Sequence, residues 1–278
     1  MIREKLVVKI FRWLLLMTLL IIFAFPLYWM IVTSLQPVGG FAGDRTPYLI
    51  PKIVTLESYK YIINNIDFIK EYLNSLIVSI STTFIVVFLS VMAAYGFSRF
   101  TFIGKQKIIA GMLIFQMFPK IILVIPFFIF MRLLGLLSTN IGLIISYTSF
   151  ALPFTIWLLV GFFDAIPKSL DECAMIDGAT PIQAFYKIVL PLAAPGVVAT
   201  ALFAFVLSWQ EYLFALVLSI RPGSALLTQG LAGMIQEWVT LYEPMMAGAV
   251  LAIFPLVIIY FFLEKYLVSG LTAGAVKE

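Results

Sequence analysis

The segment 168–195 carries the most informative sequence pattern of this chain. It is polar to mixed in character, lies between apolar runs, and has the pattern of two short helices joined by a sharp corner. Ser169 and Glu172 stand at capping-box spacing, which predicts a helix that starts at Leu170. Gly178 can take the left-handed conformation that ends such a helix. A rigid polar corner of this kind would give another protein a surface to push against.

The second helix of the corner has its own start and stop signals. Thr180 and Pro181 fit its N-cap and first position, and Pro191 and Pro195 close it. Asp177 lies at the C-terminal end of the first helix, where a negative charge is disfavoured by roughly 0.3–1 kcal/mol. We expect its carboxylate to accept backbone N–H groups of the second helix and so to hold the corner rigid.

The remaining candidates for chemistry are few. The chain contains no His and one Cys, Cys173, which removes His-based metal sites, catalytic triads and proton relays, and also an internal disulfide. Lys120 and Glu211 are charges inside apolar runs, and each costs ~2.5–3.5 kcal/mol at the centre of a membrane helix. We expect both to face the bundle interior or a wet cavity. Lys120 then either lines a solute path or is a structural charge satisfied by Glu211 or water.

The elements around these residues are apolar enough to cross a membrane. Only 12% of the residues are charged, whereas a soluble domain carries roughly a quarter. Six apolar runs come near the ~20 residues that a helix needs to span the hydrocarbon core. We predict an all-α membrane protein with one transmembrane domain over residues 1–278 and spans at 13–35, 72–97, 108–131, 141–163, 197–220 and 245–263.

The Lys and Arg residues indicate the orientation. With the N-terminus inside, the cytoplasmic segments carry eleven of them and the external segments six, which favours N-in, C-in and places the corner in the cytoplasm. The run 13–35 is longer than a signal-peptide core and is interpreted as an uncleaved first span. Because the basic residues are scattered at the edges of spans, a nucleic-acid partner is not expected.

The corner resembles the loop with the Glu-Ala-Ala…Gly signature in binding-protein-dependent ATP-binding-cassette (ABC) importers. Here the signature runs from Glu172 to Ala179 and continues with Phe185, Ile188, Leu190-Pro191 and Pro195, with Cys173 in place of the usual first Ala. Three further segments, 136–143, 208–213 and 270–277, are similar to the sugar-importing, maltose-transporter type of this family. Together the similar pieces cover most of residues 112–278.

This resemblance implies a type I ABC importer permease in the inner membrane, which imports carbohydrates and has no ATPase site of its own. The implied partners are a second permease in a heterodimer, two cytoplasmic ATPase subunits, an extracytoplasmic solute-binding protein and membrane lipid. The resemblance implies no cofactor or metal in this chain, and it implies that ATP and Mg are bound by the partner ATPase. The main alternative is an ion-coupled secondary transporter, which would need intramembrane carboxylates or His, and only Glu211 qualifies.

The resemblance implies a coupling role for residues of the corner, and the chemistry of the residues suggests the other roles. The ATPase-coupling set is Glu172, Cys173, Ala174, Asp177, Gly178, Ala179 and Phe185. Glu172 either caps its own helix or pairs with a basic residue of the ATPase, and both readings stay open. The candidate solute pathway comprises Lys120, Glu211, Trp209 and Tyr212, whose two aromatic rings could stack on sugars or simply pack. In the external segment 221–244, the expected contacts of the binding protein are Ser224, Gln229 and Gly230, and the tail 268–278 is expected to reach the ATPase as an extended segment.

Overall fold

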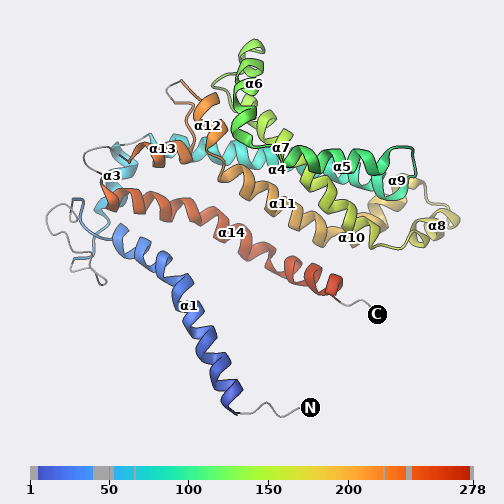
Figure 1. Ribbon diagram of the computed structural model, residues 1–278, viewed down its shortest axis with the longest axis horizontal. Coiled ribbons are helices and arrows are strands. Elements are labelled where there is room, and N and C mark those ends of the chain that lie inside the picture. Colours follow the sequence, from blue (N-terminus) through green and yellow to red (C-terminus); the bar gives the residue numbers. More distant parts are fainter. Residues whose placement is uncertain are drawn as a thin grey trace. The chain divides into compact units, whose positions relative to one another are not determined.

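The computed structural model describes residues 6–39, 50, 53–65, 67–221, 223–235 and 240–275, and in these ranges every regular element is a helix (Figure 1). The predicted all-α fold is therefore confirmed. Four helical stretches are long and apolar enough to cross a membrane by themselves, and two bent helix pairs would bring the number to six. The four are Val8–Ser34, Phe68–Arg99, Asn140–Asp164 and Tyr242–Glu264.

The contacts divide the chain into two compact units, of which the first comprises residues 1–68 and 230–254. It contains α1 (Leu6–Ser34), α3 (Glu57–Asn65) and the first part of α14 (Tyr242–Ala275). The end of α1 and the start of α3 are joined by the hydroxyl pair Ser34–Tyr59 at 2.8 Å. Most side chains of α1 are exposed in this chain, which suits a helix that faces lipid or a second subunit.

The second unit comprises residues 69–229 and 255–278. Its helices are packed around α7 (Asn140–Asp164), against which α5, α11 and α12 lie. Tyr147, Phe150 and Phe214 fill one part of its core, and Leu159 and Phe163 fill another. The other elements are α4 (Phe68–Arg99), α5 (Lys105–Gln116), α6 (Lys120–Leu133), α8 (Ser169–Ile176), α9 (Pro181–Ala184), the π-helical turn η1 (Phe185–Val189), α10 (Leu190–Leu192), α11 (Ala194–Trp209), α12 (Leu213–Leu218), the start of α13 (Leu227–Gly233) and the second part of α14.

Two of the predicted spans are not continuous helices. The run 108–131 is broken between α5 and α6, which meet at an angle of 97°. The break falls at Pro119, whose extended ψ of 121° fits the N-cap of α6 and whose ring cannot lie inside a helix without removing a backbone hydrogen bond. Beyond it, α6 packs against α12, and its Phe127 ring still meets the Phe150 ring of α7 at 5.1 Å (Figure 1).

The run 197–220 was also predicted as one helix, and this prediction is wrong. Helix α11 ends at Trp209, and α12 starts at Leu213 after a three-residue break that contains Glu211. A second bend of 73° separates the helical stretch Pro181–Leu192 from α11. The tail differs as well, because α14 continues as a helix to Ala275 where an extended segment was expected. Residues 276–278 of that tail lie outside the described residues.

Candidate functional site

The first helix of the corner, α8, starts one residue earlier than predicted. Lys168 occupies its N-cap position, where no side chain caps the helix, and Ser169 is already helical. The predicted capping box of Ser169 and Glu172 is therefore wrong. Asp171 and Glu172 both lie in the first turn, where the positive end of the helix dipole stabilises carboxylates without a capping bond.

The end of α8 has the predicted left-handed glycine. Gly178 has φ of +88°, and its N–H donates to the carbonyl of Met175 at 3.1 Å. The N–H of Ala179 reaches back to the carbonyl of Ala174 at 2.9 Å. These two bonds form a Schellman motif, which satisfies the last carbonyls of the helix and turns the chain sharply.

The second helix of the corner starts as predicted, at Thr180 and Pro181. The Thr180 hydroxyl accepts the Gln183 N–H, and the Gln183 side chain accepts the Thr180 N–H at 2.8 Å, so that a complete capping box forms. Asp177 was expected to satisfy these N–H groups, but it makes no hydrogen bond to the second helix within the described chain. Gln183 takes that role, and the Asp177 carboxylate is exposed.

The predicted coupling residues divide into an exposed face and a buried side. Glu172, Cys173, Asp177 and Gly178 are exposed, as is most of Ile176. The corner therefore presents a surface with two carboxylates, one thiol and an apolar side chain.

The buried side of the corner attaches it to the rest of the unit. Ala174 and Phe185 are buried, and Ala179 is half-buried. The Phe185 ring lies 4.5 Å from the Tyr95 ring of α4, centroid to centroid. Ala174 and Phe185 thus contribute by packing inside this chain, which differs from the partner contact that the sequence suggested for them.

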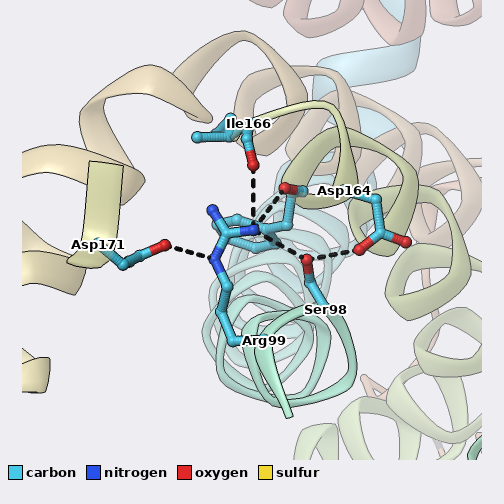
Figure 2. Close-up of polar contacts among 6 residues, drawn as sticks. Ser98, Arg99, Asp164, Ile166 and Asp171 are labelled. Carbon is cyan, nitrogen blue, oxygen red and sulfur yellow. Dashed lines mark hydrogen bonds and ion pairs between the residues drawn. The ribbon is translucent and has the colours of Figure 1, made fainter. Parts of the chain in front are cut away.

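A buried polar cluster that the sequence did not predict lies beneath the corner (Figure 2). Arg99, the last residue of α4, places its Nε 2.8 Å from a carboxylate oxygen of Asp171 on α8. Its Nη1 donates to the backbone carbonyls of Phe163 and Ile166 at the end of α7, both at 3.1 Å. In the sequence Arg99 counted only as an orientation signal, since nothing local marks a partner that is so distant along the chain.

Glu211, one of the candidate solute-path residues, is used inside the chain. Its side chain is buried, and Oε2 accepts the N–H groups of Phe214 and Ala215 at 2.9 and 3.4 Å. These amides belong to the second and third residues of α12, so Glu211, one residue before the N-cap position Tyr212, satisfies two N–H groups in the first turn of the helix that begins after the break. The Thr228 hydroxyl donates to the Glu211 backbone carbonyl at 3.0 Å and ties the same break to α13.

Lys120 lies at the first position of α6 and is exposed. It forms no ion pair with Glu211, although the two charges interact electrostatically. Its ammonium group lies 6.0 Å from the centroid of the Phe150 ring, a distance at which a cation is attracted to the face of the ring. Lys120 and Glu211 are therefore close enough to interact electrostatically. They do not form the local ion pair that was one of the two expectations for Lys120.

The two aromatic candidates differ in exposure. Trp209 is buried, stacked on Phe205 at 5.6 Å and met edge-on by Tyr72 at 5.7 Å, so its ring is engaged in packing. Tyr212 is 40% exposed, so its ring is not fully enclosed by this chain.

The expected contact loop is well anchored. Asn74 of α4 donates to the carbonyls of Gly223 and Ala225, and Ser75 accepts the N–H of Leu227. The Gln229 side chain accepts the N–H of Leu226 at 2.9 Å and so caps α13. Ser224 is half-buried and hydrogen-bonded to Ser219, and Gly230 is helical. The described part of this segment is thus a rigid turn and helix more than a loose connector.

An all-helical chain with several spans, a polar capped corner and an anchored connecting loop is typical of a membrane transport subunit. Among the described residues, no group of three or more His, Cys, Asp or Glu side chains is placed to hold a metal ion.

The comparison with known proteins gives the family. Residues 87–273 match the binding-protein-dependent transport system inner membrane component, and the chain belongs to this family. The chain is an ABC importer permease, and the ion-coupled transporter is not supported.

Relatives with similar sequences cover nearly the whole chain. The trehalose transport system permease protein SugB of Mycobacterium tuberculosis (strain CDC 1551 / Oshkosh) is 38% identical over 95% of this chain and 97% of its own length. The trehalose/maltose transport system permease protein MalG of Thermococcus litoralis (strain ATCC 51850 / DSM 5473 / JCM 8560 / NS-C) is 38% identical over 92% of both chains. Among solved structures, a bacterial ABC transporter involved in the import of the acidic polysaccharide alginate matches with a TM-score of 0.80 and 25% identity, over 95% of this chain and 98% of the other.

Proposed function

We propose that this chain is a permease for a carbohydrate, that it forms the solute path together with a second permease, and that two separate ATP-hydrolysing subunits drive it through the α8–α9 corner. The relatives that are named for trehalose, maltose and related sugars support the substrate class. ATP and Mg are bound by the partner ATPase, and this chain performs no chemistry.

The exposed face of the corner is the observation that carries the coupling role. The Glu172 carboxylate is exposed and makes no hydrogen bond or ion pair within the described chain. It is therefore free to pair with a basic residue of an ATPase, and the capping alternative loses its support. The neighbouring Cys173 and Gly178 are small and exposed, so a partner surface can approach the helix closely.

The proposed cycle links the corner to alternating access. Closure of the ATPase pair on ATP moves α8 and α9, the bundle opens outward to accept solute from the binding protein, and hydrolysis returns it inward. In this cycle the corner and both chain termini lie in the cytoplasm. The anchored segment 223–235 lies outside and meets the binding protein, and Lys120 and Tyr212 contribute to the solute path.

The native cysteine allows a direct test of the coupling role. A photo-crosslinker attached to Cys173, the single Cys of the chain, should form an adduct with an ATP-hydrolysing protein in native membranes, and the Cys173→Ser variant should form none. Absence of that adduct in every nucleotide state would reject the docking role. A crosslinker at Ser224→Cys in the Cys173→Ser background should reach a solute-binding protein instead.

The substrate class is tested separately. The purified complex, with its binding protein, is given a panel of sugars, amino acids and peptides while ATP hydrolysis is followed. Stimulation by one or more sugars is expected. Stimulation by an amino acid or a peptide alone would overturn the carbohydrate assignment and would leave the coupling role intact.

A further inference from the structure

The buried cluster under the corner joins three helices through one side chain. Arg99 lies at the carboxyl end of α4, and its guanidinium contacts both the end of α7 and the first turn of α8. The adjacent Ser98 donates to the Asp164 carboxylate at 2.6 Å and adds a second bond between α4 and α7 (Figure 2). The chain itself links α7 to α8 through the four residues 165–168.

The contacts of Arg99 suit a structural tie. The carbonyls of Phe163 and Ile166 belong to the last turn of α7 and its exit, where the negative end of the helix dipole favours a cation. The side chains of Arg99 and Asp171 are 6% and 10% exposed, so neither charge can replace its partner with bulk water. Loss of one member would leave the other as an uncompensated buried charge.

The contact between Arg99 and Asp171 is a close ion pair. Nε of Arg99 lies 2.8 Å from the Asp171 carboxylate, and the Tyr95 side chain of α4 interacts with the same carboxylate. The charge pair therefore holds α8 close to the ends of α4 and α7.

We propose that Arg99 is a pivot residue, which ties α8 to the ends of α4 and α7 so that movement of the corner is passed to both helices. Without the pivot, the 165–168 connection would absorb part of that movement. The proposal rests on the coupling role of the corner. Arg99 is a positioning residue, because it touches neither solute nor nucleotide and acts through Asp171.

The tie can be measured without the ATPase. The full chain in membrane vesicles is spin-labelled at Cys173, which lies two residues after Asp171 and is exposed. Asp171→Asn removes the charge with little change of shape and leaves the bonds of Arg99 to α7. We expect this variant and Arg99→Gln to lose the immobilised component of the nitroxide spectrum. Asp171→Glu keeps the charge and should retain that component.

Lys168→Gln is the matched control. It removes an exposed cation at the N-cap of α8 whose ammonium group forms no ion pair with Asp171, and it leaves the backbone bond from the Asp171 N–H to the Lys168 carbonyl in place, so its spectrum should match that of the unaltered chain. Solute uptake is measured for the same variants, at equal amounts of inserted chain. Asp171→Asn should reduce uptake while Cys173 in an unlabelled sample still crosslinks to the ATPase, and Asp171→Glu should restore most of the uptake.

The outcomes separate this proposal from the one on which it rests. An unchanged spectrum in Asp171→Asn would show that Arg99 does not hold α8 and would overturn the pivot. A more mobile label with full uptake would overturn the transmission of movement. If the spectra change as expected but Cys173 never crosslinks to an ATPase, the tie is supported and the docking role of the corner fails.

Discussion

Replacement of Gly178 by Ala tests the corner at its most constrained position. A Cβ at this glycine would meet no atom within 4 Å, so the substitution creates no clash inside the chain. The cost arises only from φ of +88°, a left-handed conformation that disfavours L-residues by roughly 1–2 kcal/mol. A change of this size raises the population of the open turn, in which the Gly178 and Ala179 N–H groups are not hydrogen-bonded, by a factor of about 5–30 relative to the closed turn.

Hydrogen exchange reports the opening of the turn directly. The amides of Gly178 and Ala179 close the Schellman motif, so the peptide that contains them should exchange about 5–30 times faster in Gly178→Ala. Gly178→Asn is the matched control, because Asn is several-fold enriched in left-handed conformations and should exchange more slowly than the Ala variant. Both chains should still insert into the membrane.

Uptake by the same variants separates strain from docking. If the backbone alone matters, uptake should follow the exchange rates and Asn should outperform Ala. If the partner requires a bare glycine surface, both variants should lose uptake although the Asn turn stays closed. Unchanged exchange in Gly178→Ala would refute the argument, because the left-handed turn would then cost nothing.

Three further predictions follow from the other sites. Glu211→Ala leaves the N–H groups of Phe214 and Ala215 without their acceptor, which costs about 1–3 kcal/mol for a buried group, and should lower the thermal midpoint of the purified chain more than Glu211→Gln does. Equal losses would contradict the capping role. Lys120→Met should insert at least as well but lose solute-stimulated ATP hydrolysis, and retained stimulation with the same solute would make Lys120 a structural charge. Deletion of 271–278 should alter the rate of hydrolysis without changing insertion, and an unchanged rate would argue against a docking role for the tail.

Short-range patterns decided the parts of the fold that the sequence predicted correctly. The length and apolar character of the spans depend on each segment alone, since about 20 apolar residues must be helical in hydrocarbon. The ends of the corner helices also depend on nearby residues. The glycine turn at Gly178 uses bonds to Met175 and Ala174, and the capping box of Thr180 reaches only to Gln183.

The sequence predictions were wrong where two nearby residues could satisfy the same backbone N–H groups or begin the same helix. Ser169 and Glu172 had the spacing of a capping box, but the helix began one residue earlier and left Ser169 inside it. Asp177 was expected to satisfy amides that Gln183 satisfies from a better position in the next helix. The break at Glu211 was missed because a buried charge inside an apolar run looks like a pore residue, whereas here it caps a new helix.

Which side chains meet across the bundle depends on how the helices pack in three dimensions. Ser98 and Asp164 are 66 positions apart, and Arg99 reaches carbonyls 64 and 67 positions further along the chain. No pattern near Arg99 marks those partners, because the packing of α4 against α7 brings them together. Trp209 is buried against Phe205 and Tyr72, whereas Tyr212 is exposed, although both lie in one aromatic motif. The sequence alone therefore determined the apolar runs, the turn at Gly178, the capping box at Thr180 and the family resemblance, whereas three-dimensional packing decided which polar groups hold the corner in place.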